Sequence, residues 1–155
     1  MDVIEILLES SVTTSPEEAW AWITSLKGIS EEMHPYFRMT APAGVTSIND
    51  IAVDPGKPLF RSRVFLFCIL PIDYSDITLV EINKGTGFIE QSPMGSMKLW
   101  RHERRIVPTA DGCKIVDHVT FEPKWASPVV GWFIRVVFRH RHRVLQKRLG
   151  TMENP

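Results

Sequence analysis

The stretch that decides the fold is SMKLWRHERRIVPTADGCKIVDHVTFEP, residues 96–123. Two runs of β-favouring residues, 97–107 and 114–123, flank TADG (109–112), which is typical of a hairpin turn. Apolar and charged residues alternate along both runs, so each strand is expected to turn one face toward a core. The sequence therefore predicts an antiparallel pair of strands.

The hairpin also predicts which residues share a face. A loop of two or four residues places even-numbered positions of the first strand beside odd-numbered positions of the second. Most of the charged residues then collect on the other face, which we assign to solvent. The inner face would carry Trp100, His102, Arg104, Ile106, Ile115, Asp117, Val119 and Phe121.

Three ionisable residues therefore point inward, and two of them, Arg104 and Asp117, are directly opposite or diagonal to each other. Buried charges are costly unless paired, and such a pair seldom stabilises more than apolar residues would. One interpretation is that His102, Arg104 and Asp117 line a wet cavity and orient the polar end of a ligand. The other is an ion pair at the open end of the sheet, with His102 bonded to the backbone.

Outside this hairpin, the pattern predicts a strand over 2–12 and a helix capped by Ser15, with Pro16 at its first position and Gly28 at its end. A second, short helix is expected from Ser30 to just before Pro35. Strands follow over 59–70, ended by Pro71, and over 76–82 and 87–92.

The last predicted element is a long helix from Ser127 to Gly150, whose apolar face includes Phe138 and is interrupted by Arg141. An antiparallel sheet needs its apolar face covered, and this helix is the only predicted element long enough. We therefore expect one α+β domain over 1–155. Its curved antiparallel sheet of about six to seven strands would wrap around the C-terminal helix, with two short helices between strands 1 and 2 and a hollow inside.

This arrangement resembles the helix-grip superfamily of START lipid-transfer domains, birch-pollen allergen relatives and polyketide cyclases and dehydrases, often called SRPBCC. Members often carry Trp-x-His on the penultimate strand, a glycine in the hairpin, Asp-x-Val-x-aromatic on the last strand and Phe-x-x-Arg in the last helix. This sequence has them at Trp100 and His102, Gly112, Asp117, Val119 and Phe121, and Phe138 and Arg141. The resemblance implies the fold, and the superfamily holds carriers, receptors and enzymes alike.

Composition narrows the function classes. The chain has 155 residues, 44% hydrophobic and 23% charged, with a net charge of zero, which gives no global attraction for nucleic acid. Cys68 and Cys113 show no metal-binding spacing, and no nucleotide-binding glycine motif occurs, so we expect no metal and no cofactor. The N-terminus does not resemble a signal peptide, so a cytoplasmic location is expected. RHRHR (139–143) is interpreted as a solvated helix end, Arg141 excepted.

The leading hypothesis is a carrier or sensor that binds a small hydrophobic molecule: a lipid, an isoprenoid or a polyketide-like compound. The ligand-binding candidates are the eight residues Trp100, His102, Arg104, Asp117, Val119, Phe121, Phe138 and Arg141. The second hypothesis is a cyclase- or dehydrase-type enzyme with His102 as general acid/base. The third is a protein- or RNA-interaction module at the basic helix end. Trp132 and Phe133 are candidates for transient membrane contact, and the sequence identifies no protein partner.

Overall fold

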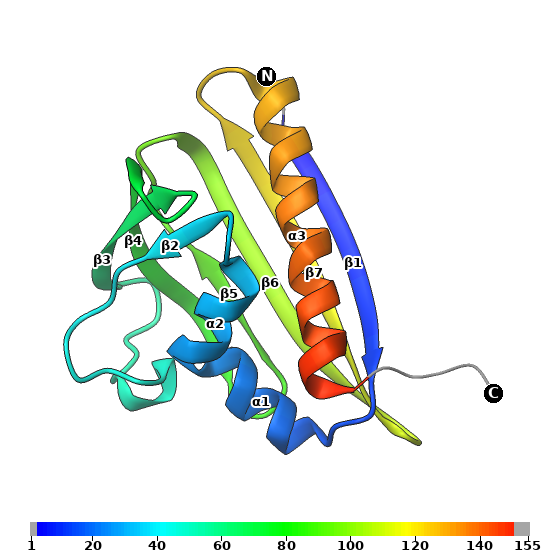
Figure 1. The fold of residues 1–155 in the computed structure, drawn as a ribbon. Coiled ribbons are helices and arrows are strands. Elements are labelled where there is room, and N and C mark those ends of the chain that lie inside the picture. The colour runs from blue at the N-terminus through cyan, green and yellow to red at the C-terminus, as the bar shows by residue number, and fades with distance from the viewer. Residues whose placement is uncertain (1–2, 151–155) are drawn as a thin grey trace.

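The computed structural model describes residues 3–150 and confirms the predicted helix-grip architecture (Figure 1). Seven strands form one antiparallel sheet in the order β1-β7-β6-β5-β4-β3-β2. Two short helices lie between β1 and β2, and a long helix ends the chain. The elements are β1 (Ile4–Val12), α1 (Pro16–Thr24), α2 (Leu26–Met33), β2 (Phe37–Met39), a 3₁₀ turn (Ile48–Asp50), β3 (Pro58–Leu66), β4 (Leu70–Asn83), β5 (Gly87–Gln91), β6 (Met97–Thr109), β7 (Gly112–Pro123) and α3 (Ser127–Leu149).

Helix α3 lies across the inner face of the sheet, over β7 and β1 (Figure 1). It buries the predicted stripe, including Ile134, Phe138 and Leu145, and stops before Gly150, whose φ of 92° suits a residue without a side chain. Ser127 is not its cap, because Ala126 occupies that position and provides no side-chain hydrogen bond. No helix within residues 3–150 combines the length and the apolar character needed to cross a bilayer.

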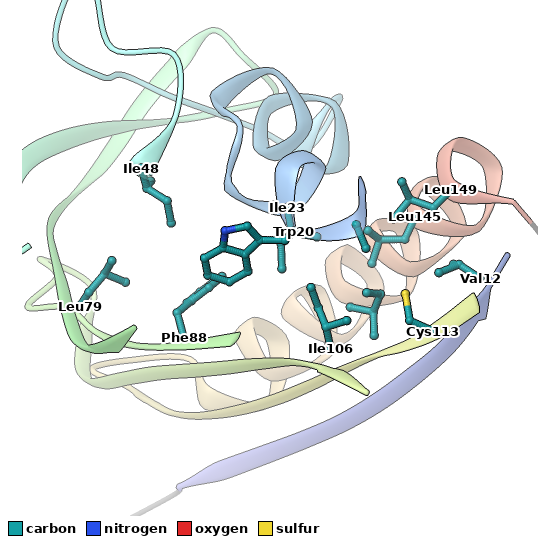
Figure 2. Close-up of a cluster of buried hydrophobic side chains, with 12 residues drawn as sticks. Val12, Trp20, Ile23, Ile48, Leu79, Phe88, Ile106, Cys113, Leu145 and Leu149 are labelled. Carbon is teal, nitrogen blue, oxygen red and sulfur yellow. The ribbon is translucent and has the colours of Figure 1, made fainter. Parts of the chain in front are cut away.

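The core is divided into two hydrophobic clusters along the length of α3. One lies where α1 meets the end of α3 and contains Val12, Trp20 and Leu145 (Figure 2). The other lies under the first half of α3 and contains Phe121 and Phe138. The strand positions between the two clusters carry the charged inner residues of β6 and β7.

The break between the first two helices differs from the prediction. Ser15 caps α1 as expected, accepting from the Glu18 backbone N–H at 3.2 Å. The chain breaks at Ser25, however, and not between Gly28 and Ser30. The Ser25 hydroxyl accepts from the Gly28 N–H at 2.9 Å and donates to the Trp22 carbonyl at 2.8 Å. Ser25 therefore ends α1 and caps α2, which leaves Gly28 inside α2.

The strand predicted over 59–70 is also wrong, because it is two strands joined by a turn. β3 ends at Leu66 and β4 begins at Leu70, with Phe67 and Cys68 at φ values of 50° and 66° between them. A run without glycine or asparagine gives no sequence signal for such a turn. Pro71 does not end the strand but lies within β4, where β4 is paired with β3 and not with β5. A proline is tolerated there because the missing N–H breaks no second ladder.

Gly28 is expected to be required for the α1–α2 junction. A Cβ at this position would lie 2.3 Å from the Trp22 carbonyl oxygen, so Gly28→Ala forces the two helices apart. We expect a loss of about 1–3 kcal/mol in the free energy of unfolding, measured by urea denaturation. Lys27→Ala, at the exposed neighbouring position, is the control and should change it by less than about 0.5 kcal/mol. Equal effects of both substitutions would contradict the steric explanation.

Candidate functional site

The residues of β6 and β7 that point to the inner face of the sheet are those predicted from the hairpin. Trp100 lies opposite Phe121, His102 opposite Val119, and Arg104 directly opposite Asp117. The side chains of Arg104 and Asp117 are completely buried, and His102 is 3% exposed. Of the two registers that the sequence allowed, the structure therefore adopts the direct pairing. Arg104 and Asp117 do form the ion pair of the second interpretation, but the pair is buried and not at an open end, and His102 bonds to Asp117 and not to the backbone.

Asp117 is the acceptor for three basic side chains. Arg104 donates to both of its oxygens, from Nε to Oδ1 and from Nη2 to Oδ2, each at 2.7 Å. His102 Nε2 lies 2.7 Å from Oδ1, and His142 Nε2, from α3, lies 2.8 Å from Oδ2. The Ser10 hydroxyl of β1 is 2.7 Å from the other nitrogen of His142. Hydrogen bonds to Asp117 of β7 thus connect it to β6 and α3, and the contact of Ser10 with His142 connects β1 to α3.

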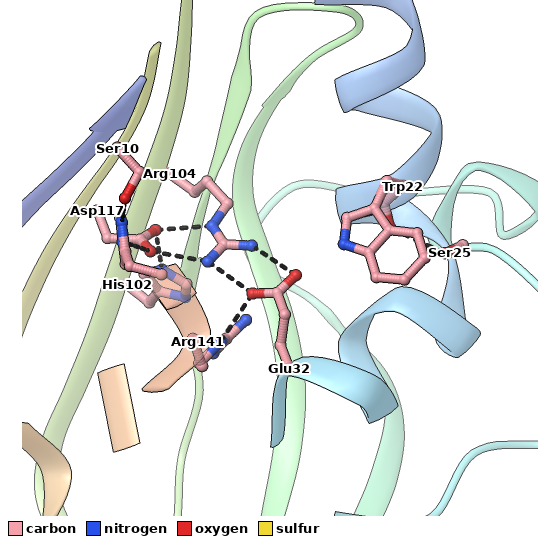
Figure 3. A network of polar contacts seen from close by, with 9 residues as sticks. Ser10, Trp22, Ser25, Glu32, His102, Arg104, Asp117 and Arg141 are labelled. Atoms are coloured by element: carbon pink, nitrogen blue, oxygen red, sulfur yellow. Dashed lines mark hydrogen bonds and ion pairs between the residues drawn. The ribbon is translucent and has the colours of Figure 1, made fainter. Parts of the chain in front are cut away.

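Glu32 of α2 receives the remaining donors (Figure 3). Arg104 Nη1 donates to Oε2 at 3.2 Å, and its Nη2 is 2.9 Å from Oε1. Arg141 Nε of α3 donates to Oε1 at 3.1 Å. Two buried carboxylates therefore face two buried guanidinium groups, and Arg104 bridges both carboxylates. We call Ser10, Glu32, His102, Arg104, Asp117, Arg141 and His142 the charge network.

Electrostatics keeps both acids ionised. Burial alone would raise the pKa of each carboxyl. The attraction of Arg104 outweighs this effect at Asp117, the hydrogen bond from His102 adds to it, and together they hold the pKa of Asp117 well below 3.8. Arg104 and Arg141 likewise lower the pKa of Glu32 below 4.5. Burial lowers the pKa of His102 below 6.5 despite the neighbouring Asp117, so the imidazole is neutral at pH 7.

Beside the charge network lies a cavity of about 660 Å³. Its wall is formed by the inner faces of β3, β4, β5 and β6 together with α2 and the first half of α3, and is mainly apolar. Three predicted ligand-binding residues, Trp100, His102 and Arg141, line this cavity. The other five are not on its wall: Arg104, Asp117, Val119, Phe121 and Phe138. The structure thus divides the eight candidates into a lining group and a supporting group.

The polar part of the wall contains residues that sequence reasoning did not place. Glu90 pairs with His102 across β5 and β6, so both face the cavity. Ser62 and Ser75 pair across β3 and β4 and are each 1% exposed. The Ser62 hydroxyl has no hydrogen-bond partner in the described part of the chain. These side chains provide hydrogen-bonding groups inside an otherwise apolar space.

His102 connects the charge network to the cavity. Its Nε2 is held by Asp117, whereas its Nδ1 forms no hydrogen bond with any residue between 3 and 150. The ring packs edge-on against Phe88 and Phe138, with centroids 5.8 and 5.2 Å away. A neutral imidazole fixed in this way presents one ring nitrogen to a bound molecule. Within the described chain, no group of three or more His, Cys, Asp and Glu side chains is placed to hold a metal ion.

Glu32 and His142 are members of the charge network that the sequence analysis missed, although each carried a signal. Glu32 lies three residues after Ile29 and falls beside the apolar face of α2. His142 lies four residues after Phe138 and three before Leu145, so it shares their buried stripe. The RHRHR segment is therefore a solvated helix end only in part, because both Arg141 and His142 are buried. A polar residue on an apolar stripe was the usable signal in both cases.

Acid should destabilise the protein in two steps. Unfolded His102 takes up a proton near pH 6.5, whereas folded His102 resists it, so stability is lost as the pH falls below about 6.5, by up to about 1.4 kcal/mol per pH unit. Glu32 and Asp117 have depressed pKa values, so their contribution is present above about 4.5 and is lost at lower pH. Urea denaturation between pH 7.5 and 5.5 measures the first step.

His102→Gln keeps a donor for Asp117 and should flatten that first step. His118→Gln, on the outer face of β7, is the matched control and should retain more of the slope. If both variants had the wild-type pH dependence, the assignment of this step to His102 would be wrong.

Comparisons with solved structures show the same fold. A START superfamily protein from Mycobacterium smegmatis aligns with a TM-score of 0.63 at 11% identity, covering 95% of this chain and 96% of that one. Ara h 8.0201 aligns with a TM-score of 0.63 at 13% identity, covering 96% and 98%. The di-domain ARO/CYC StfQ from the steffimycin biosynthetic pathway aligns with a TM-score of 0.63 at 11% identity, covering 95% of this chain and 51% of StfQ.

Sequence comparison identifies the family without naming an activity. No curated protein matches this sequence. A family model described as "Domain of unknown function (DUF8410)" matches residues 10–149, which is most of the chain. The protein with this charge network and cavity is therefore a member of the DUF8410 family, with a START-like helix-grip fold.

Proposed function

We propose that the protein binds a small, mainly apolar molecule in its internal cavity, of the lipid, isoprenoid or polyketide-like class. The observation that carries this proposal is the cavity of about 660 Å³ with a mainly apolar wall and a few polar side chains. Ligand sites in proteins have this volume and composition. Burial of apolar ligand surface, at roughly 25 cal/mol per Å², would drive uptake.

Two side chains are proposed to orient the polar end of the ligand. Arg141 reaches the cavity while its Nε is held by Glu32, and its guanidinium lies 4.9 Å from the Phe138 ring centroid. His102 presents its ring beside it, fixed by Asp117. Trp100 adds an apolar surface next to both. In this proposal Arg104 and Asp117 act through the residues they position, and Val119, Phe121 and Phe138 support the wall from behind.

The proposal also covers cofactors, cellular location and the class of partner. A molecule of this class requires no metal and no cofactor for binding, and the proposal includes neither. The zero net charge gives no long-range attraction for nucleic acid, which favours a carrier or sensor over a nucleic-acid-binding protein. A cytoplasmic location is part of the proposal. The exposed basic residues of α3 are Arg135, Arg139, Arg143, Lys147 and Arg148, and the first four recur at every fourth position along one side of the helix.

Filling the cavity should abolish binding without unfolding the protein. Ser75→Phe places a ring in the cavity, so we expect the affinity for the fluorescent probe N-phenyl-1-naphthylamine to fall at least about tenfold, equivalent to about 1.4 kcal/mol. Val80→Phe, at an exposed position of the same strand, is the control and should bind like the wild type.

Native mass spectrometry of the purified protein gives the second readout. A hydrophobic compound that co-purifies with the wild type and with Val80→Phe, but not with Ser75→Phe, would support the proposal and identify the ligand. Probe binding that is equally strong in all three proteins would place the binding elsewhere and refute the proposal.

The second candidate function is catalysis, and the observation that supports it is the position of His102. A neutral imidazole held by a buried carboxylate is an arrangement suited to proton transfer near neutral pH. With a cyclisation or dehydration substrate of the polyketide type, His102→Ala should reduce turnover at least about a hundredfold while affinity changes less than about threefold. An equal loss of turnover and affinity would assign His102 to binding alone.

A further inference from the structure

The second half of the most apolar segment of the chain is turned outward. Residues 64–72, VFLFCILPI, form the tip of the β3–β4 hairpin, where Ile69 is 74% exposed. Phe67, Leu70 and Ile72 are each about half exposed as well. Phe67 has a φ of 50°, which is a strained conformation for a bulky residue. Strain and exposed apolar surface at one turn indicate that this tip has a role other than packing the core.

A second group of exposed apolar side chains comes from the first turns of α3 and the segment just before it. Trp125, Val129 and Trp132 are each more than 60% exposed. Val129 and Trp132 are three residues apart on the helix, so they point to the same side. Phe133 packs edge-on against Phe67 of the hairpin tip, with ring centroids 6.2 Å apart, which brings the two groups together.

These two groups surround the opening of the cavity. Phe67 and Ile72 of the tip, Trp125 just before α3 and Val129 in α3 all line its wall while remaining exposed to solvent. We define the mouth patch as Phe67, Ile69, Leu70, Ile72, Trp125, Val129 and Trp132. A patch of this kind on a surface is expected to meet a partner.

The charges around the mouth patch are mainly positive; the nearest acid in the sequence, Asp73, accepts hydrogen bonds from the backbone N–H groups of Tyr74 and Ser96. The segments that form it, 59–72 and 124–143, contain no aspartate or glutamate, although the chain has 18 acidic residues and zero net charge. Arg38 donates from Nε to the Cys68 carbonyl at the tip, at 3.3 Å. Lys124 precedes Trp125, and Arg135 follows Trp132 by one turn. None of these three cations forms an ion pair within residues 3–150.

We propose that the mouth patch docks on the surface of a membrane containing anionic lipids. Apolar tips and tryptophans that project from the protein suit the boundary between headgroups and acyl chains, and flanking cations suit anionic headgroups. An acidic protein would satisfy the cations but not four projecting aliphatic or aromatic groups on a hairpin tip. Ligand entry from the bilayer through the mouth rests on the proposed function, whereas the docking itself does not.

The test is flotation of the full chain with vesicles of phosphatidylcholine alone and of phosphatidylcholine with about one third phosphatidylserine. The wild type should bind the anionic vesicles at least about tenfold more strongly than the neutral ones, and added salt should weaken this binding. The double variant Ile69→Ser/Trp132→Ser should lose at least about tenfold in binding. Leu7→Ser/Val107→Ser removes exposed apolar residues elsewhere and should bind like the wild type.

Other outcomes of this experiment would overturn the proposal or separate it from the proposed function. No binding of the wild type to either vesicle, or an equal loss in both double variants, would overturn the proposal. A concentration-dependent dimer that Ile69→Ser/Trp132→Ser disrupts, without vesicle binding, would overturn it in favour of a contact between copies. The cavity-filling variant Ser75→Phe should still float with the vesicles, so a failure of ligand binding is distinguishable from a failure of docking.

Discussion

Arg104 holds two carboxylates in a part of the protein that water does not reach, and the rest of the structure is arranged around this bridge. Its guanidinium is bidentate to Asp117 of β7 and also reaches Glu32 of α2. Removing one partner from such a buried set typically costs about 3–5 kcal/mol, because the other charge is left uncompensated. The position of α2 over the sheet is therefore fixed by charge as well as by apolar packing.

The bridge also explains why the interior can be hollow. Apolar packing holds a fold together only where side chains fill the space. Here the two apolar clusters are separated by the charge network, whose hydrogen bonds have defined directions and span β1, β6, β7, α2 and α3. The elements on either side of the cavity are thus tied together without filling it. The same bonds fix the ring of His102 and the guanidinium of Arg141 against the cavity wall.

The features of the fold and site that could be predicted from the sequence were those set by residues close together in the chain. The hairpin at 109–112 fixed the phase of both flanking strands, so the inward direction of His102, Arg104 and Asp117 followed from local rules. Glu32 required knowledge of how α2 packs against a strand 72 residues away, which no local pattern contains. The turn at Phe67 was hidden because its residues favour strands, and the break at Ser25 was hidden because a serine inside a helical pattern resembles an ordinary surface residue.

The hairpin tip has a consequence for the colloidal behaviour of the protein. Its first seven residues, VFLFCIL (64–70), are uncharged, free of proline and of high β-propensity, which is the composition of segments that nucleate fibrils. Within residues 3–150, the strand that covers the outer edge of β3 beside it is the three-residue β2. Pro71 and the tight turn at Phe67 oppose the addition of a further strand, as gatekeeper residues do. The exposed apolar side chains of the tip still make it the place where concentrated preparations are expected to associate first, and detergent or lipid that covers it should suppress this association.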